Sequence, residues 1–353
     1  MAARHERALD AARRAGGDAL LAARPSTVAW LTGFAGDIET GPSPFALSPL
    51  AVLAPGETPI LVVSDDDAEA AAALGCDVRS YAGFTVEPLD PVGGAARALA
   101  DAVGGRRVAA EAGALPAALA QAVSWVDVGD GLRLAQAVKD DDELELIRAA
   151  LALCDVGQKT VRERAEPGLT ELELWAIVHG AIEQEAGART PVLADLVAGP
   201  RTGDTGGAPG ARELREGDLV LCDLVPRRQG YWGDCCATFA LGEPSPGARE
   251  KHRIARERLE RVLEAVRPGA VAGELDTLAR DGLDYPHHSG HGLGADWHEE
   301  PRIVPGSETV LEAGMVVAFE PGVYAPAEGA RVEQVVLVTD DGCEILSGHE
   351  LEL

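Results

Sequence analysis

The chain of 353 residues contains no asparagine and only three lysines, although it has 28 arginines. The absence of asparagine excludes N-linked glycosylation. Acidic residues number 58 against 31 basic ones, which leaves a formal net charge of −27. Such a chain lacks the basic stripe that binding to a nucleic-acid backbone requires, so we expect no nucleic-acid partner.

Long apolar runs are also missing, and runs such as 335–338 are far too short to span a bilayer. The first 14 residues are partly basic but lack the apolar stretch of a secretory signal. The six cysteines form no CxxC pair, and the chain is too long for a disulfide scaffold. These features predict a cytoplasmic protein with reduced thiols and no membrane partner.

The acidity has two explanations. Excess surface carboxylate keeps a protein soluble where salt screens the repulsion, which predicts a halophilic protein from a cell with molar internal salt. A GC-rich genome would explain the few lysines, but it would not explain a net charge of −27. On either explanation the charge says little about the substrate.

The length and a hydrophobic content of 46% predict two globular domains. In the first part, short apolar runs alternate with helical patterns and turn residues, which predicts an N-terminal α/β domain over 1–137. It has no glycine-rich phosphate loop and nothing that suggests catalysis. The predicted strands are 28–31, 49–53, 59–63, 108–110 and 124–128, and the predicted helices are 8–22, 94–103 and 116–123.

An acidic cluster at 139–143 suits a helix start, and we place the domain boundary near 138. Thr170 and Glu173 predict a capping box that opens a second helix. The rest predicts an α+β domain over 138–353. Its further helices are expected at 249–266 and 272–281, and its strands at 218–224, 231–241, 315–320 and 332–339.

Four of the eight histidines lie within twelve residues, at His287, His288, His291 and His298. Such clustering is typical of a metal or proton-transfer site. The HExxH motif is excluded, because the pair 298–299 is followed by Glu-Pro-Arg.

Four carboxylates accompany these histidines. Asp223 and Asp234 lie 11 residues apart on either side of a predicted hairpin turn, and Glu320 and Glu333 are embedded in apolar strands. Each acid alone could instead lie on a solvated face. Together, four carboxylates and one histidine suit two divalent cations, with Mn²⁺ a natural occupant.

This set resembles the pita-bread metallopeptidases, which include methionine aminopeptidase, aminopeptidase P and prolidase. The resemblance rests on the order Asp223, Asp234, His291, Glu320, Glu333, and on the Gly-His-Gly, His-Glu-x-Pro, Glu-Pro-Gly and Arg-x-Glu contexts. It covers 138–353, and the N-terminal domain resembles that of the creatinase and prolidase branch.

The resemblance implies two metal ions per chain, most readily Mn²⁺ with Co²⁺ or Zn²⁺ as alternatives. Asp223 would hold one ion, His291 and Glu320 the other, and Asp234 and Glu333 would bridge both. It also implies a homodimer.

It further implies that Glu320 moves a proton to the leaving amine and that His298 donates to the substrate carbonyl. His287 would lie near the substrate, and Arg331 would help to order and bind it. His288 has no counterpart, and we expect a structural role for it.

The chain departs from the family pattern at three places. A histidine expected about a dozen residues before Asp218 is missing, and the position falls on Gly206; Arg201 or Asp204 are conceivable substitutes. Where the family has Thr-Arg-Thr, this chain has Cys-Ala-Thr at 236–238. Where the family has a glycine two residues after the first metal-binding aspartate, this chain has Val225.

The cysteines beside the acids leave two alternatives. Cys222 and Cys235 should face away from the site, whereas Cys236 could face it, either as a thiolate ligand or as a small core residue. Tyr231 and Trp232 could wall the pocket or pack in the core.

The main hypothesis is an Xaa-Pro aminopeptidase or Xaa-Pro dipeptidase. The second is a hydrolase or lyase of the same fold that acts on a small amide, amidine or compatible solute. The third is a non-catalytic binding module for basic proteins.

Overall fold

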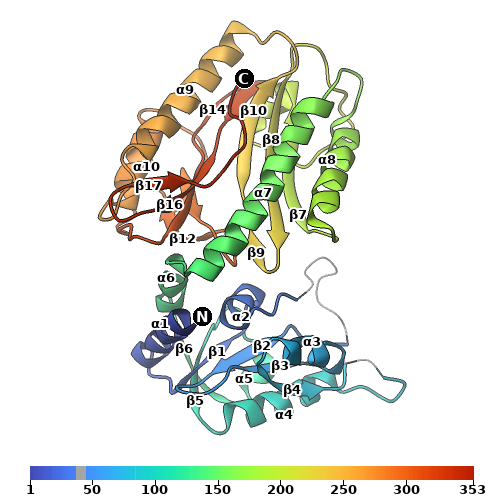
Figure 1. The fold of residues 1–353 in the computed structure, drawn as a ribbon, viewed down its shortest axis with the longest axis vertical. Coiled ribbons are helices and arrows are strands. Elements are labelled where there is room, and N and C mark those ends of the chain that lie inside the picture. Colours follow the sequence, from blue (N-terminus) through green and yellow to red (C-terminus); the bar gives the residue numbers. More distant parts are fainter. Residues whose placement is uncertain (37–44, 84) are drawn as a thin grey trace. The chain divides into compact units, whose positions relative to one another are not determined.

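The computed structural model describes residues 1–36, 45–83 and 85–353 (Figure 1). The chain divides into two compact units, Met1–Gln136 and Ala137–Leu353, which are described separately. Within these described residues, no helix combines the length and apolar character needed to cross a bilayer.

The N-terminal unit is built on a six-stranded sheet of order β4-β3-β2-β1-β5-β6. Strand β1 pairs antiparallel with β2 and parallel with β5, so the sheet is mixed. The strands are β1 (Ala19–Ala22), β2 (Leu50–Leu53), β3 (Ile60–Ser64), β4 (Asp77–Tyr81), β5 (Arg107–Ala110) and β6 (Ser124–Asp127). The helices are α1 (Ala2–Arg14), α2 (Pro25–Thr32), η1 (Asp65–Asp67), α3 (Ala68–Ala73), α4 (Pro91–Val103), α5 (Ala117–Ala120) and, at the boundary, α6 (Gly131–Ala137).

Two predicted elements of this unit are assigned wrongly, and β4 and α3 were not predicted. The helix predicted over 8–22 ends at Arg14, because Gly16 turns the chain with a φ of +86°, and 19–22 become a strand buried in the middle of the sheet. The strand predicted at 28–31 lies inside α2. Pro25 opens that helix and Gly33 closes it in the left-handed conformation, and these end signals outweigh a short apolar run.

The C-terminal unit begins with two long helices. The acids at its start form a capping box between Asp140 and Glu143, and the predicted box between Thr170 and Glu173 is present. The helices of this unit are α7 (Asp141–Arg164), α8 (Glu171–Ala186), η2 (Gly199–Asp204), α9 (Pro246–Leu263) and α10 (Ala272–Arg280).

Three sheets complete this unit, with orders β10-β8-β7, β12-β11-β13-β16-β17 and β14-β15; the short β9 pairs with β8. Helix α7 packs on β8 and α9 packs on β15 (Figure 1). The strands are β7 (Val192–Ala198), β8 (Leu219–Arg228), β9 (Tyr231–Trp232), β10 (Cys235–Ala240), β11 (Gly290–Gly292), β12 (Glu299–Ile303), β13 (Val316–Phe319), β14 (Gly322–Ala325), β15 (Glu328–Arg331), β16 (Gln334–Val338) and β17 (Cys343–Ile345).

Candidate metal centre

The hairpin predicted between the two aspartates is present and places both acids at one site. Strand β8 pairs antiparallel with β10, with Asp223 opposite Cys236, and Asp234 lies immediately before β10. On the other edge of β8, Asp195 of β7 lies directly opposite Asp223. Directly opposed residues share one face of a sheet, so Asp195 and Asp223 project to the same side.

The second sheet supplies the remaining candidate ligands. His291 is the middle residue of β11, opposite Ala318 of β13, and Glu320 follows β13. Backbone hydrogen bonds fix both glutamates, because Glu320 N–H donates to the Ser289 carbonyl and Glu333 N–H donates to the Cys236 carbonyl across the two sheets. The five predicted ligands therefore come from two sheets that meet at one point.

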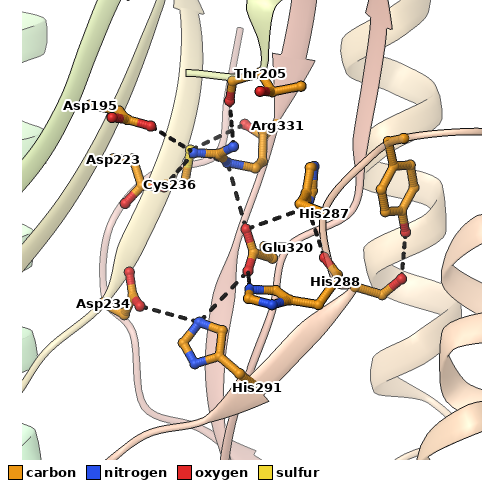
Figure 2. A network of polar contacts seen from close by, with 12 residues as sticks. Asp195, Thr205, Asp223, Asp234, Cys236, His287, His288, His291, Glu320 and Arg331 are labelled. Carbon is orange, nitrogen blue, oxygen red and sulfur yellow. Dashed lines mark hydrogen bonds and ion pairs between the residues drawn. The ribbon is translucent and has the colours of Figure 1, made fainter. Parts of the chain in front are cut away.

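Figure 2 shows that the side chains of Asp223, Asp234, His291 and Glu320 point toward one another. His291 Nε2 lies 3.4 Å from Asp234 Oδ2 and 3.6 Å from Glu320 Oε1. Ligand atoms of Asp234, His291 and Glu333 all lie within 4.8 Å of one another. Such separations suit atoms that surround one cation at ordinary metal–ligand distances of about 2 Å.

The histidine of this cluster is prepared to bind a metal. His291 Nδ1 lies 2.9 Å from the Gly292 carbonyl, an arrangement that assigns the proton to Nδ1 and leaves the Nε2 lone pair facing the carboxylates. Burial lowers the pKa of His291 to about 3 and those of His287 and His298 to about 4. All three imidazoles are therefore neutral at pH 7.

The carboxylates carry the electrostatic signature of a cation site. Burial raises the pKa of Asp223 to about 6, against the opposing charge of Arg331. Burial and the neighbouring acids also raise the pKa of Asp234 and of Glu333 well above their ordinary values. For Glu320 burial acts in the same direction, but the hydrogen bond from His288 and the charge of Arg331 outweigh it and hold its pKa well below the ordinary value.

Among the residues that the structure describes, one carboxylate oxygen of this cluster has no hydrogen-bond partner. Glu333 is 1% exposed, and its Oε1 is buried without a hydrogen bond. A buried acid that lacks a donor and has like charges around it is destabilising unless a cation binds there. The residues present therefore fit divalent metal ions.

A cavity of about 590 Å³ opens over the cluster. It is lined by Asp223, Asp234, His291 and Glu320, together with the predicted substrate residues His287, His298 and Arg331. The structure thus brings these sequence-predicted residues together, and Glu333 lies behind them.

His288, for which we expect a structural role, also lines the cavity, and its Nε2 lies 2.9 Å from Glu320 Oε1. Sequence reasoning also missed Asp195, the apolar Leu193, and Trp297, whose ring stacks on His298 with centroids 4.1 Å apart. The signal for Trp297 was its place directly before His298. Asp195 had no signal, since its strand was not predicted.

Arg331 is held by several acceptors at once. Its Nη2 donates to Asp223 Oδ2 at 2.5 Å, and its Nη1 donates to the Thr205 carbonyl and the Tyr324 hydroxyl (Figure 2). The same hydroxyl lies 3.0 Å from His287 Nε2. Arg331 therefore connects a candidate metal ligand to a candidate substrate residue and orders both.

The departures from the family pattern have structural outcomes. Arg201 and Asp204 are not among the residues that line the cavity, and Arg201 instead pairs with the buried Glu171, so neither stands in for the missing histidine. Tyr231 and Trp232 are buried outside the cavity lining, which favours core packing.

The positions of the cysteine side chains in the sheet bear on the two alternatives for Cys236. Gln158 Nε2 binds the Cys222 carbonyl and Cys235 Sγ, on the side of the sheet that α7 covers. Cys236 lies in the apolar cluster with Val197 and Leu221, and burial raises its pKa well above the ordinary value. Cys236 is directly opposite Asp223, on the site's side of the sheet, and its Sγ lies 3.3 Å from Arg331 Nε. Among the described residues it belongs neither to the cavity lining nor to a group of candidate metal ligands, which favours the small core residue over the thiolate ligand.

Comparison with known proteins places this geometry in a family. Residues 145–340 match the model of metallopeptidase family M24, and residues 4–130 match that of the creatinase/prolidase N-terminal domain.

Among curated proteins, the chain is 36% identical over 248 residues to a probable dipeptidase PepE of Mycobacterium tuberculosis, covering 67% of this chain and 66% of that protein. It is 35% identical over 235 residues to the Xaa-Pro dipeptidase of Pyrococcus furiosus, covering 64% of this chain and 67% of that protein. The alignments thus span about two thirds of the length of these relatives. Among solved structures, the prolidase of Pyrococcus horikoshii superposes with a TM-score of 0.83 at 26% identity and 98% coverage of each chain.

Proposed function

Because the chain belongs to metallopeptidase family M24, we propose that it uses two divalent ions to hydrolyse the peptide bond before proline in short peptides, with Xaa-Pro dipeptides as its preferred substrates. The convergence of Asp234, His291 and Glu333, with the buried Glu333 Oε1 lacking a hydrogen bond, is the observation that carries this proposal.

The family membership, the creatinase-like N-terminal domain and the pita-bread catalytic domain that the sequence predicted are all confirmed. Metal-dependent peptidase chemistry, predicted from the same motif, is confirmed at the level of the family. This disfavours the non-peptidase and binding-module alternatives.

We assign Asp223, Asp234, His291, Glu320 and Glu333 as the metal ligands. Divalent ions bound there would supply a water ionised near neutral pH and would polarise the scissile carbonyl. The donor set of four carboxylates and one imidazole favours Mn²⁺ as the first ion to test, with Co²⁺ and Zn²⁺ beside it.

The chain's own side chains would carry the protons. Glu320 would accept the proton of the attacking water and pass it to the leaving nitrogen. His298, which is neutral and lines the cavity, would donate its N–H group to the substrate carbonyl. His287 donates its own N–H group to the His288 carbonyl, so it would contact the substrate as part of the cavity wall. Arg331 would hold Asp223 and His287 in register through its shared contacts.

The relatives favour the dipeptide over longer substrates, because both curated proteins above are described as dipeptidases. The test is hydrolysis of Xaa-Pro dipeptides, Xaa-Pro-Yaa tripeptides and non-proline controls in molar KCl with Mn²⁺, beside a chelated sample. We expect chelator-sensitive cleavage of Xaa-Pro dipeptides. Cleavage of tripeptides alone would assign an aminopeptidase, and no cleavage despite bound metal would reject the proposal.

The sequence predictions of a halophilic, cytoplasmic homodimer belong to the same proposal. The charge of −27 supports the first, since exposed acids repel less where salt is molar. Light scattering in 0.1 M and 3 M KCl would measure the assembly state in each salt, and melting curves in the same buffers would measure the salt requirement.

A further inference from the structure

A carboxylate outside the predicted ligand set lines the same cavity. Asp195 faces the site from β7 beside Asp223 (Figure 2). Its side chain is 39% exposed, whereas that of the candidate ligand Asp234 is 6% exposed. Asp195 is therefore open to the space that a substrate would occupy.

This carboxylate has no hydrogen-bond donor among the residues that the structure describes. Arg331 Nη2 is 3.8 Å away, beyond hydrogen-bond range, and that guanidinium already donates to Asp223 and Thr205. Two acids directly opposed across a strand pair repel each other. The charge of Asp195 therefore destabilises the folded protein, and this favours a role for Asp195 in binding a ligand.

Asp195 also occupies the place beside Gly206, where the family resemblance predicts a histidine. A Cβ added at Gly206 would lie 2.0 Å from Asp195 Oδ2, so no side chain fits there while Asp195 keeps this position. Leu196 N–H donates to the Gly207 carbonyl and holds that loop against β7. The chain therefore presents an acid here in place of an imidazole.

The charges of the cavity differ between its two ends. Asp195 and Asp223 lie at one end, and the imidazoles of His287 and His288 lie at the other (Figure 2). A peptide carries an ammonium group at its first residue and acceptor oxygens beyond it. Two divalent ions would balance the four ligand carboxylates, which leaves Asp195 outside that set to meet a cation.

We propose that Asp195 binds the free α-ammonium group of the substrate and so selects peptides with an unblocked N-terminus. This inference rests on the proposed function, because it deepens the recognition of substrate at the same site.

The test compares alanyl-proline with propanoyl-proline, which lacks only the amino group, on the metal-loaded wild type and on Asp195→Asn. We expect kcat/KM for alanyl-proline to fall about tenfold in the variant, mainly through KM, since a charge-assisted hydrogen bond is lost at a partly exposed site. The value for propanoyl-proline should not change. Asp204→Asn is the matched control, because it removes a nearby carboxylate that does not line the cavity.

Lysyl-proline is assayed beside the two compounds. Three results would overturn the proposal: an equal loss on alanyl-proline and propanoyl-proline, a loss of bound metal in Asp195→Asn, or a loss confined to lysyl-proline. An equal loss would mean that Asp195 orders Arg331, and a loss of metal would mean that it helps to bind the ions. A loss confined to lysyl-proline would mean that it binds a cationic side chain of the substrate. If the wild type cleaves no peptide, calorimetry of the same two compounds still decides. Tighter binding of alanyl-proline that Asp195→Asn abolishes would support the ammonium site while the proposed function fails.

Discussion

Two buried glutamates, one in each unit of the chain, show opposite ways of keeping an acid inside a protein. Glu111, just after β5, receives hydrogen bonds from the backbone N–H groups of Ala23 and Arg24 at 3.0 Å and from the Thr27 hydroxyl at 2.9 Å. Glu333 is more deeply buried, yet its Oε1 has no donor and the acids around it repel its charge.

The presence or absence of hydrogen-bond donors distinguishes an acid that stabilises the fold from an acid that binds a ligand. Glu111 binds the start of α2, where N–H groups lack helical partners, so its donors come from its own domain. Glu333 lies where a cation is needed to offset its burial. A buried acid without donors is therefore a better indicator of a metal site than a buried acid as such.

The largest effect should follow from Glu333→Gln, which keeps the shape and removes the charge. We expect the variant to lose at least about 10³-fold in kcat, because the cavity would lose a metal ligand that stabilises the charge of the reaction. Kinetics together with metal content measured by mass spectrometry would check this. Full activity with two bound ions would contradict the ligand assignment.

Removal of metal should destabilise the protein through Glu333 and leave the contribution of Glu111 unchanged. We expect a chelator to lower the free energy of unfolding by roughly 3–4 kcal/mol relative to protein with metal at 100 to 1,000 times its Kd. Calorimetric melting with and without Mn²⁺ measures the difference. Glu111→Gln should keep the full metal-dependent shift, whereas Glu333→Gln should lose most of it.

Glu111→Gln should act on stability alone. The amide oxygen of glutamine can still accept from Ala23 and Arg24, but the hydrogen bonds lose the charge of the carboxylate, and the ion pair with the Arg24 side chain is lost. We expect a cost of about 1 kcal/mol. Urea unfolding gives the loss, and metal content should stay at the wild-type value. A change in bound metal would mean that the two units are coupled.

The catalytic half was more predictable than the N-terminal half, because its ligands carry local context. Asp223, Asp234, His291, Glu320 and Glu333 each lie in a short pattern that the sequence displays directly, and the hairpin between the first two follows from turn residues. The α/β class of the N-terminal unit followed from the alternation of apolar runs.

The parts that were missed depend on pairing between distant segments. Asp195 reaches the site because β7 lies beside β8, which a single sequence does not reveal, and Asp195 itself divides the apolar residues of that strand into 192–194 and 196–198. His288 was judged by its lack of a family counterpart, although its contact is with Glu320, 32 residues later. The run 28–31 was taken for a strand because four apolar residues fit either structure.

The finest distinction between the two kinds of buried acid is their response to pH in the metal-free protein. Burial raises the pKa of Asp234 in the folded state above its ordinary value of 3.8, so the folded protein holds this proton more tightly than the unfolded chain does. The resulting contribution to stability is present at low pH and is lost as pH rises through the folded-state pKa.

An asparagine at position 234 cannot ionise, so its stability does not fall with rising pH for this reason. The melting temperature of chelated Asp234→Asn should therefore match the wild type near pH 4 and exceed it increasingly toward pH 7. Added Mn²⁺ should reverse the order by stabilising only the wild type, and the control Glu111→Gln should lie below the wild type with or without metal. If chelated Asp234→Asn lies below the wild type at pH 7, Asp234 is held by donors in the manner of Glu111, and the contrast between the two units would fail at this residue.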